Sequence, residues 1–230
     1  MHRTFLAICF AGLLTAAGPP WADKPVEQWN EQDAKQILSG SPWVKKIIPA
    51  QLANVSEEAR RQSGRMGGGQ GQGVGLTALG PSAVTGVGSS EPSRKRRRGI
   101  GPVEVRWESA RPVRIAEKTT REDDPPAWQG DMYAIAIYDV PGLDVDQKGL
   151  AAELKHAALL KAGRKKELRP TEVQLLPQEG DLTTIVYLFP RSVEITPEDQ
   201  GVKFWARFGR STITQNFSLR EMQLQGKLEL

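Results

Sequence analysis

The residues from Leu182 to Phe189 form an almost continuous apolar run, rich in β-branched and aromatic side chains, which Pro190 ends. A short run of this composition is typical of a strand that is buried on both faces of a sheet. Other strand-like runs and an amphipathic helix accompany it in the C-terminal part of the chain. The sequence therefore predicts a folded C-terminal domain organised around this strand.

The first 22 residues have the pattern of a secretory signal peptide. A positive start, Met1-His2-Arg3, precedes an uncharged apolar run from Phe5 to Ala17. A membrane-spanning helix needs about 20 apolar residues, so this run is too short to be one. Cleavage can follow Ala17 or Ala22, and we expect the second site because prolines crowd the first. We therefore expect a periplasmic or extracellular protein with no transmembrane segment after signal removal.

The only cysteine, Cys9, lies inside the expected signal peptide. Its removal leaves no thiol for disulfides, for nucleophilic catalysis or for zinc ligation. One histidine, His156, then remains, on the expected solvated face of a helix. A zinc site would need carboxylates alone, which zinc rarely uses. We therefore expect neither a cofactor nor a metal ion.

Five consecutive basic residues account for the positive net charge of the chain: Arg94, Lys95, Arg96, Arg97 and Arg98. Without them the formal charge falls from +4 to −1. Such a run can bind nucleic acid, anionic lipid or cell-surface polyanions, or it can be a solvated, protease-sensitive linker. We favour the linker, because no aromatic residues interleave the run and export separates it from nucleic acid.

Composition divides the chain after the signal into three parts. Residues 23–55 contain an expected helix and first strand, residues 56–101 are rich in glycine and polar residues, and residues 102–230 hold the main domain. The middle part cannot bury enough apolar surface to fold, so we expect a disordered linker. Its glycine run, residues 64–75, lacks the Gly-Lys-Ser/Thr ending and the flanking strand and helix of a phosphate-binding loop.

The segment after the signal predicts a short amphipathic helix. Asn30 can cap its start, and Asp33 stands three residues further on, as in a capping box. Its apolar face is formed by three residues: Ala34, Ile37 and Leu38. A strand or a second short helix follows over residues 44–48, and we favour the strand because these residues are largely β-branched.

The main domain contains alternating strand patterns and two further helices. Strands are expected at residues 103–108, 132–138, 173–176, 182–189, 202–208, 212–219 and 222–230. A short helix is expected from Ser109 through Lys118, and a longer one from Asp144 or Asp146 to Ala162. Because strands outnumber helices and cluster late, we expect an α+β fold. It would be a single domain with a mainly antiparallel sheet and two or three helices, interrupted by the long glycine-rich loop.

Six short elements are spread over most of the chain. They are Trp29 to Leu38, Ser41-Pro42-Trp43, Arg106-Trp107-Glu108-Ser109-Ala110, Leu188-Phe189-Pro190-Arg191, Leu219-Arg220-Glu221-Met222 and Gly226-Lys227-Leu228-Glu229-Leu230. Through them the chain resembles a group of uncharacterised exported proteins from Acidobacteria. In that group a glycine-rich insert of variable length separates the Ser-Pro-Trp element from the Trp-Glu-Ser-Ala element. The resemblance implies that residues 43–48 pair with residues 103–108 as strands, and it implies no activity.

Two local groups are candidates for chemistry. Glu122-Asp123-Asp124 could bind calcium, but a calcium loop needs spaced oxygen ligands and prolines follow at once, so we favour a solvated loop. Ser109 could be a nucleophile, but it has no Gly-x-Ser-x-Gly elbow and no histidine partner, so we expect a helix cap. We therefore assign no catalytic residue.

Three tryptophans are candidate binding residues: Trp43, Trp107 and Trp205. Trp205 lies between Lys203 and Arg207 on one face of its strand, and an aromatic ring flanked by cations can bind a glycan, a peptide or another protein. It can also pack beneath the N-terminal helix. We favour this second interpretation, because an amphipathic helix needs a sheet face to cover.

With no catalytic constellation in the sequence, we expect a non-catalytic exported binding or protein-interaction module of the periplasm or cell envelope. Its partner would be an envelope protein or a glycan. One alternative is a carboxylate-dependent envelope hydrolase, which requires a cleft with two close carboxylates of raised pKa. Another is polyanion binding through Arg94–Arg98, which would be sensitive to salt.

Overall fold

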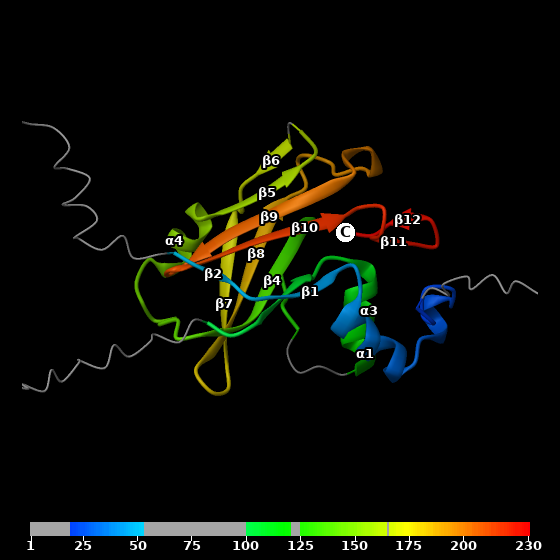
Figure 1. The fold of residues 1–230 in the computed structure, drawn as a ribbon, viewed down its shortest axis with the longest axis horizontal. Helices are drawn as coiled ribbons and strands as arrows, with labels where there is room; N and C mark the ends of the chain where they lie inside the picture. Colours follow the sequence, from blue (N-terminus) through cyan, green and yellow to red (C-terminus); the bar gives the residue numbers. More distant parts are fainter. Residues whose placement is uncertain (1–18, 53–99, 121–124, 165) are drawn as a thin grey trace, which may run out of the picture.

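The structure, a computed structural model, describes residues 19–52, 100–120, 125–164 and 166–230. Two five-stranded antiparallel sheets pack against each other, and a pair of helices lies at one end of them (Figure 1). The expected α+β domain with mainly antiparallel strands is confirmed, with its strands divided between two sheets. Most of the expected signal peptide and of the expected linker lies outside the described residues. No helix in the described ranges is long and apolar enough to cross a membrane.

The first sheet, sheet A, has the strand order β1 (Val44–Ile47), β3 (Val103–Trp107), β4 (Met132–Pro141), β8 (Leu182–Pro190) and β7 (Glu172–Gln178). The second, sheet B, has the order β2 (Ala50–Gln51), β10 (Ser211–Ser218), β9 (Gly201–Phe208), β5 (Ala158–Ala162) and β6 (Lys166–Leu168). A small ribbon contains β11 (Gln223–Leu224) and β12 (Lys227–Leu228). The helices are α1 (Glu31–Gly40), α3 (Arg111–Thr120) and α4 (Leu150–His156), with short 3₁₀ turns η1 (Val26–Gln28) and η2 (Pro197–Asp199).

The main core lies between the two sheets, where apolar side chains from both pack together. The ring centroids of Trp107 and Phe217 are 5.2 Å apart, and those of Tyr187 and Phe204 are 5.5 Å apart. Such edge-to-face aromatic pairs stabilise the fold beyond the burial of their area. The prediction of a strand buried on both faces is confirmed, because residues 183–189 of β8 are all buried.

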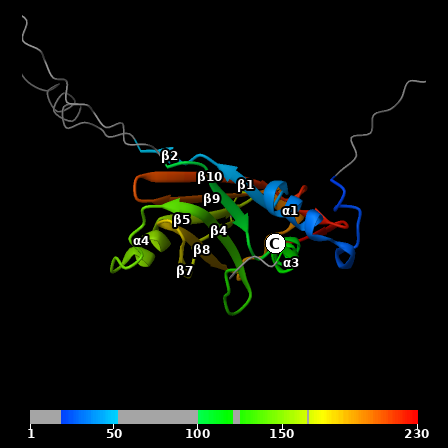
Figure 2. The ribbon, with the colours of Figure 1, turned by 90° about the horizontal axis from the view of Figure 1, so that it is seen from below.

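The expected N-terminal helix is confirmed as α1, with both bonds of its capping box. The Asp33 N–H donates to the Asn30 side chain at 2.9 Å, and the Asn30 N–H donates to the Asp33 carboxylate at 3.1 Å. The hydrogen bond from Lys24, together with the one from the Asn30 backbone, lowers the pKa of Asp33. The helix packs mainly against α3 and β1 (Figure 2), so the expectation that it covers Trp205 is wrong.

The first expected strand forms β1, which pairs with β3 in the way the resemblance implied. Val44 lies opposite Arg106 and Ile47 opposite Val103 in antiparallel register. Just before β1, the indole N–H of Trp43 donates to the backbone carbonyl of Glu229 at 2.7 Å. The edge of sheet A thus joins segments from the beginning, the middle and the end of the described chain.

Two expected elements differ from the structure. The helix expected to run to Ala162 ends at His156, because residues 158–162 alternate between buried and partly buried positions and pair as β5 with β9. The expected final strand is split into β11 and β12. Gln225 and Gly226, which connect them, have φ values of 52° and 77° and reverse the chain in a tight hairpin turn.

Trp21 belongs to the main core, with only 5% of its surface exposed. Its ring centroid lies 6.2 Å from that of Trp29 and 6.0 Å from that of Trp43, and its carbonyl accepts the Trp29 indole N–H at 3.1 Å. Cleavage after Ala22 would remove this side chain from the core, whereas cleavage after Ala17 would keep it.

We expect a chain that begins at residue 18 to be more stable than one that begins at residue 23. Loss of a buried tryptophan side chain typically lowers the free energy of unfolding by about 3–5 kcal/mol. Urea unfolding of the two purified chains measures the difference. Equal unfolding midpoints would contradict the placement of Trp21 in the core.

Candidate functional site

The candidate site lies on the face of sheet A that is turned away from sheet B, called the outer face below. A second, smaller apolar cluster covers part of this face: Ala134 and Ala136 of β4 with Val186 and Leu188 of β8. Trp128, Tyr138 and Leu176 pack around it. The alanines leave room on the central strand of the sheet, so that larger side chains from neighbouring segments can lie over it.

A β-bulge in β4 interrupts the outer face beside this cluster. The register between β4 and β8 shifts between Ile137 and Val140. Tyr138 and Asp139 therefore both lie opposite Thr184, and Asp139 has a left-handed φ of 61°. Bulges redirect the side chains around them and are common next to functional sites. Here the irregularity returns Val140 to the main core and leaves Tyr138 on the outer face.

Thr184 is the least usual residue on this face. Its side chain is 1% exposed, and its Oγ1 has no hydrogen-bond partner within the described residues. A buried hydroxyl without a partner costs about 1–3 kcal/mol relative to a paired one. Such groups are uncommon in native proteins, and each is explained by strain, by a functional role, or by an ordered water or ion that completes the bond.

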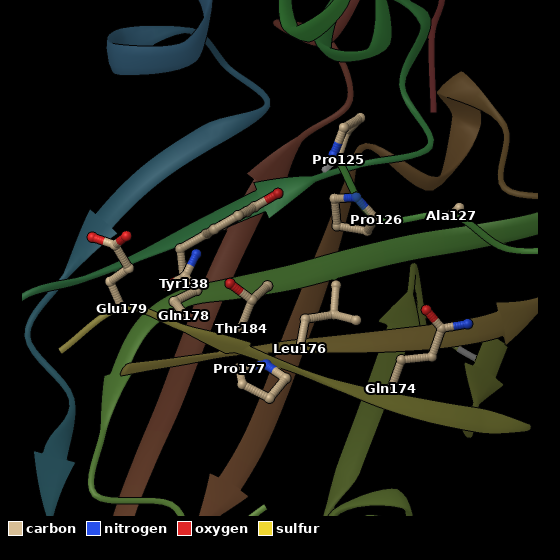
Figure 3. A pocket seen from close by; sticks show the side chains of 10 residues that line it. All are labelled: Pro125, Pro126, Ala127, Tyr138, Gln174, Leu176, Pro177, Gln178, Glu179 and Thr184. Atoms are coloured by element: carbon tan, nitrogen blue, oxygen red, sulfur yellow. The ribbon is translucent and has the colours of Figure 1, made fainter. Parts of the chain in front are cut away.

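The Thr184 side chain lies in the wall of a groove of about 890 Å³, called the outer groove below. The described residues that line it are Pro125, Pro126, Ala127, Tyr138, Gln174, Leu176, Pro177, Gln178, Glu179 and Thr184. Figure 3 shows Thr184 between Tyr138 and Leu176, with the Pro125–Ala127 segment on the other side. Gln174 lies toward one end of the groove and Glu179 at the other. A groove of this size is within the range of ligand-binding sites.

A buried cluster of charged groups lies behind the groove, centred on Arg106, which is 6% exposed. Its guanidinium lies 2.7 Å from a Glu104 carboxylate oxygen, 3.3 Å from Glu117 of α3 and 3.8 Å from Glu108. Glu117 and Glu108 are 2% and 0% exposed. We call Arg106 and these three glutamates the carboxyl cluster.

The carboxyl cluster holds one wall of the groove through Tyr138. The Tyr138 hydroxyl donates to Glu108 Oε1 at 2.8 Å, and the Arg106 guanidinium lies 4.4 Å from the centroid of its ring. Burial and the adjacent Glu108 raise the pKa of Tyr138, so its phenol remains a hydrogen-bond donor. The ring is therefore fixed by a hydrogen bond at its tip and a cation–π contact on its face.

The same cluster holds the opposite wall through Arg114 of α3. Arg114 Nη1 lies 3.6 Å from a Glu117 carboxylate oxygen and donates to the Pro126 carbonyl at 2.9 Å. Its guanidinium also lies 4.8 Å from the centroid of Trp128. Both walls of the outer groove are thus tied to the buried charges behind it.

Glu108 is the titratable group most altered by this environment. Burial raises its pKa well above the ordinary value of 4.5, and the neighbouring Glu117 raises the pKa further. The positive charge of Arg106 and the hydrogen bond from Tyr138 act in the opposite direction. A neutral Glu108 lets the charges of Arg106 and Arg114 balance those of Glu104 and Glu117.

The tryptophans that were candidate binding residues do not line the groove. Trp43 and Trp107 are fully buried in the main core, so neither can contact a ligand. We therefore no longer consider them candidate binding residues. Trp205 is partly exposed on sheet B, where it pairs with Leu159 and Thr214.

Two further expectations have clear outcomes. Ser109 is not a helix cap: its Oγ accepts the Trp107 indole N–H at 3.0 Å and the Ala134 N–H at 3.1 Å, which ties the end of β3 to β4. His156 is exposed at the end of α4, as expected. The acidic loop Glu122-Asp123-Asp124 and the basic run Arg94–Arg98 lie outside the described residues.

Neither a metal site nor a similar protein identifies the function. Within the described ranges, no group of three or more histidine, cysteine, aspartate or glutamate side chains is arranged to hold a metal ion. No family model, curated protein or solved structure matches this chain. The proposals below therefore rest on the geometry of the outer groove.

The sequence held weak signals for this site. Glu104 and Arg106 of β3, and Glu108 directly after it, alternate with apolar residues, which indicates a strand with one polar face. A polar strand face is usually exposed to solvent, so this pattern did not predict that Glu117 of α3 would pair with Arg106 there. Thr184 stands inside the apolar run of β8, where a threonine is an ordinary strand residue. Only the fold places these side chains beside Tyr138.

We expect Arg106→Met to lower the free energy of unfolding by about 3–5 kcal/mol, because it leaves buried carboxylates without their cation. The matched control is Arg111→Met. Arg111 lies 3.9 Å from Glu27, with side chains that are 53% and 77% exposed. Its loss should cost less than about 1 kcal/mol. Guanidinium unfolding measures both, and similar losses would contradict the role given to Arg106.

We expect Glu108→Gln to stabilise the fold increasingly as the pH rises. Because the folded-state pKa of Glu108 is raised, its stabilising contribution is complete below pH 4.5 and is lost as the pH rises through the folded-state value. Glutamine keeps an acceptor for Tyr138 and cannot ionise. The advantage of the variant should therefore grow by about 1.4 kcal/mol per pH unit across this window. Thermal unfolding from pH 4.5 upward measures it, and parallel curves for the two chains would contradict the assignment.

Proposed function

We propose that this chain is a non-catalytic binding module, exported to the periplasm or cell envelope, whose ligand occupies the outer groove. The sequence pattern of residues 1–22 supports export. The groove supports binding, because it combines apolar and polar side chains in a concave surface of ligand size.

The observation that carries this proposal is the Thr184 hydroxyl. It is buried and has no partner among the described residues, yet it lies in the wall of the groove. Its Oγ1 has almost no accessible surface, so a ligand with a polar group supplies the missing hydrogen bond only when the side chains over Thr184 shift. The β-bulge and the left-handed Asp139 lie at the same place, which is where backbone irregularity concentrates in binding sites.

The carboxyl cluster does not favour the alternative of an envelope hydrolase. Glycosidases use two carboxyl groups that flank the scissile bond, about 5–5.5 Å or 6.5–9.5 Å apart, in a cleft that the substrate enters. Glu108 has a raised pKa, but Glu108 and Glu117 are 0% and 2% exposed, so a substrate cannot reach them. Tyr138 stands between Glu108 and the groove as its hydrogen-bond donor. We therefore assign to Glu108 and Glu117 a structural role: together with Arg106 they hold Tyr138 in position.

The proposal predicts that filling the groove abolishes ligand binding. Leu176→Arg places a long charged side chain in the groove from a partly exposed position on β7. The tagged full-length chain is purified gently from the envelope fraction of its own cells and analysed by native mass spectrometry. We expect a co-purifying protein, peptide or oligosaccharide on the wild-type chain that is lost from the variant.

The matched control is Ile48→Arg, which makes the same change at an apolar residue that is 75% exposed and does not line the groove. It should retain the ligand, and circular dichroism should show that both variants are folded. Retention by Leu176→Arg, or a wild-type chain that carries nothing, would contradict the proposal.

A further inference from the structure

The outer groove has the length of a short extended peptide. Three alternate residues of β7 line it: Gln174, Leu176 and Gln178. A strand rises about 3.4 Å per residue, so these residues span about 14 Å. A segment in the polyproline II conformation rises about 3.1 Å per residue. About four or five of its residues would therefore cover this span.

The apolar surface of the groove is stiff. Pro125 and Pro126 lie across the groove from Leu176 and Pro177 (Figure 3). Proline side chains lose almost no conformational entropy when they are ordered, so a wall built from them costs little to immobilise. Tyr138 adds an aromatic ring that the carboxyl cluster already fixes. Proline-containing segments bind in grooves lined by aromatic and apolar side chains.

The polar groups of the groove suit a ligand with unpaired backbone carbonyls. The strands that form its floor, β4, β8 and β7, are paired with one another, so a ligand over them meets side chains and not a free strand edge. A polyproline II segment has no internal hydrogen bonds, which leaves its carbonyls available. The amide of the exposed Gln178 is one donor for them, and the buried Thr184 hydroxyl becomes a second once the side chains over it shift.

The charge of the groove favours a cationic ligand. Glu179, at one end, is the single charged residue among the described residues that line it. Glu172 adds a carboxylate beside Gln174, whose amide donates to it at 3.0 Å. Carboxylates near both ends of a neutral groove select for basic residues in the ligand and against acidic ones.

We propose that the ligand of the outer groove is a short proline-containing peptide segment in the polyproline II conformation, flanked by basic residues. This inference rests on the binding function proposed above and names its ligand class. The prolines of the segment pack on the proline and tyrosine walls. Its carbonyls accept hydrogen bonds from Thr184 and Gln178, and its basic residues lie near Glu179 and Glu172.

The test uses the chain from residue 18 to residue 230 and isothermal titration calorimetry with an end-blocked Arg-Ala-Pro-Pro-Ala-Pro-Arg peptide. Three probes are compared with it: the same peptide with glutamate at both ends, one with glycine and serine between the arginines, and N-acetylglucosamine trimer. We expect the proline–arginine peptide to bind, and the glutamate and glycine–serine peptides to bind roughly tenfold more weakly or not at all.

Two variants locate the peptide within the groove. Thr184→Val removes the hydroxyl with little change in shape and should weaken binding about two- to tenfold. It should not lower the thermal stability of the free protein, because the hydroxyl has no described partner to lose. Glu179→Lys should reduce the preference for the arginine peptide over the glutamate peptide, because only Glu172 then remains to attract a basic residue. The control, Thr214→Val on the exposed surface of β10, should bind the peptide as the wild-type chain does.

The outcomes separate this inference from the proposed function. Peptide binding that is weakened by Thr184→Val and by Leu176→Arg, but not by Thr214→Val, would support the inference. Binding of the N-acetylglucosamine trimer alone, with loss in Leu176→Arg, would overturn the peptide inference and leave the groove as a binding site. Peptide binding that neither groove variant changes would overturn the inference, and so would failure of the peptide to bind at all.

Discussion

The outer groove depends on two elements, strand β3 and helix α3. The ion pair between Arg106 of β3 and Glu117 of α3 joins them. Glu117 reaches Arg114, which holds the Pro126 segment, while Arg106 and Glu108 hold Tyr138. Ion pairs buried to this degree add little net stability compared with apolar side chains, because desolvation offsets their attraction. Their effect here is geometric: they fix two walls of one groove at a set separation.

This arrangement explains why a carboxyl group with a raised pKa, that of Glu108, occurs in a protein for which we propose no catalysis. A shifted pKa commonly marks an active site, but a structural network of charges also produces one. Accessibility distinguishes the two cases. Glu108 is fully buried and does not line the groove, whereas the residues that line it include two glutamines, three prolines and one surface carboxylate. Such a lining can recognise a ligand by shape and hydrogen bonds, and it contains no obvious pair of acid and base.

Local patterns predicted much of the fold, and they failed where distant contacts decide. The capping residues of α1, the buried β8 and the hairpins β7–β8 and β9–β10 all follow from short-range sequence signals. Residues 158–162 looked helical because they follow a helix without a strong stop, yet pairing with β9 makes them a strand. The site was beyond prediction for the same reason. Thr184, Tyr138 and Glu117 lie far apart in the sequence, and only the bulge and the packing of α3 bring them together.

The most direct test of this account is to observe which methyl groups of the protein sense a bound peptide. In a chain with isotope-labelled alanine, isoleucine, leucine and threonine methyl groups, the proline–arginine peptide is added while methyl resonances are recorded by NMR. The account predicts shifts at Ala127, Leu176 and Thr184 in the groove, and none at the exposed Ile48 and Leu52. Shifts confined to other surfaces, with the groove methyl groups unchanged, would contradict it.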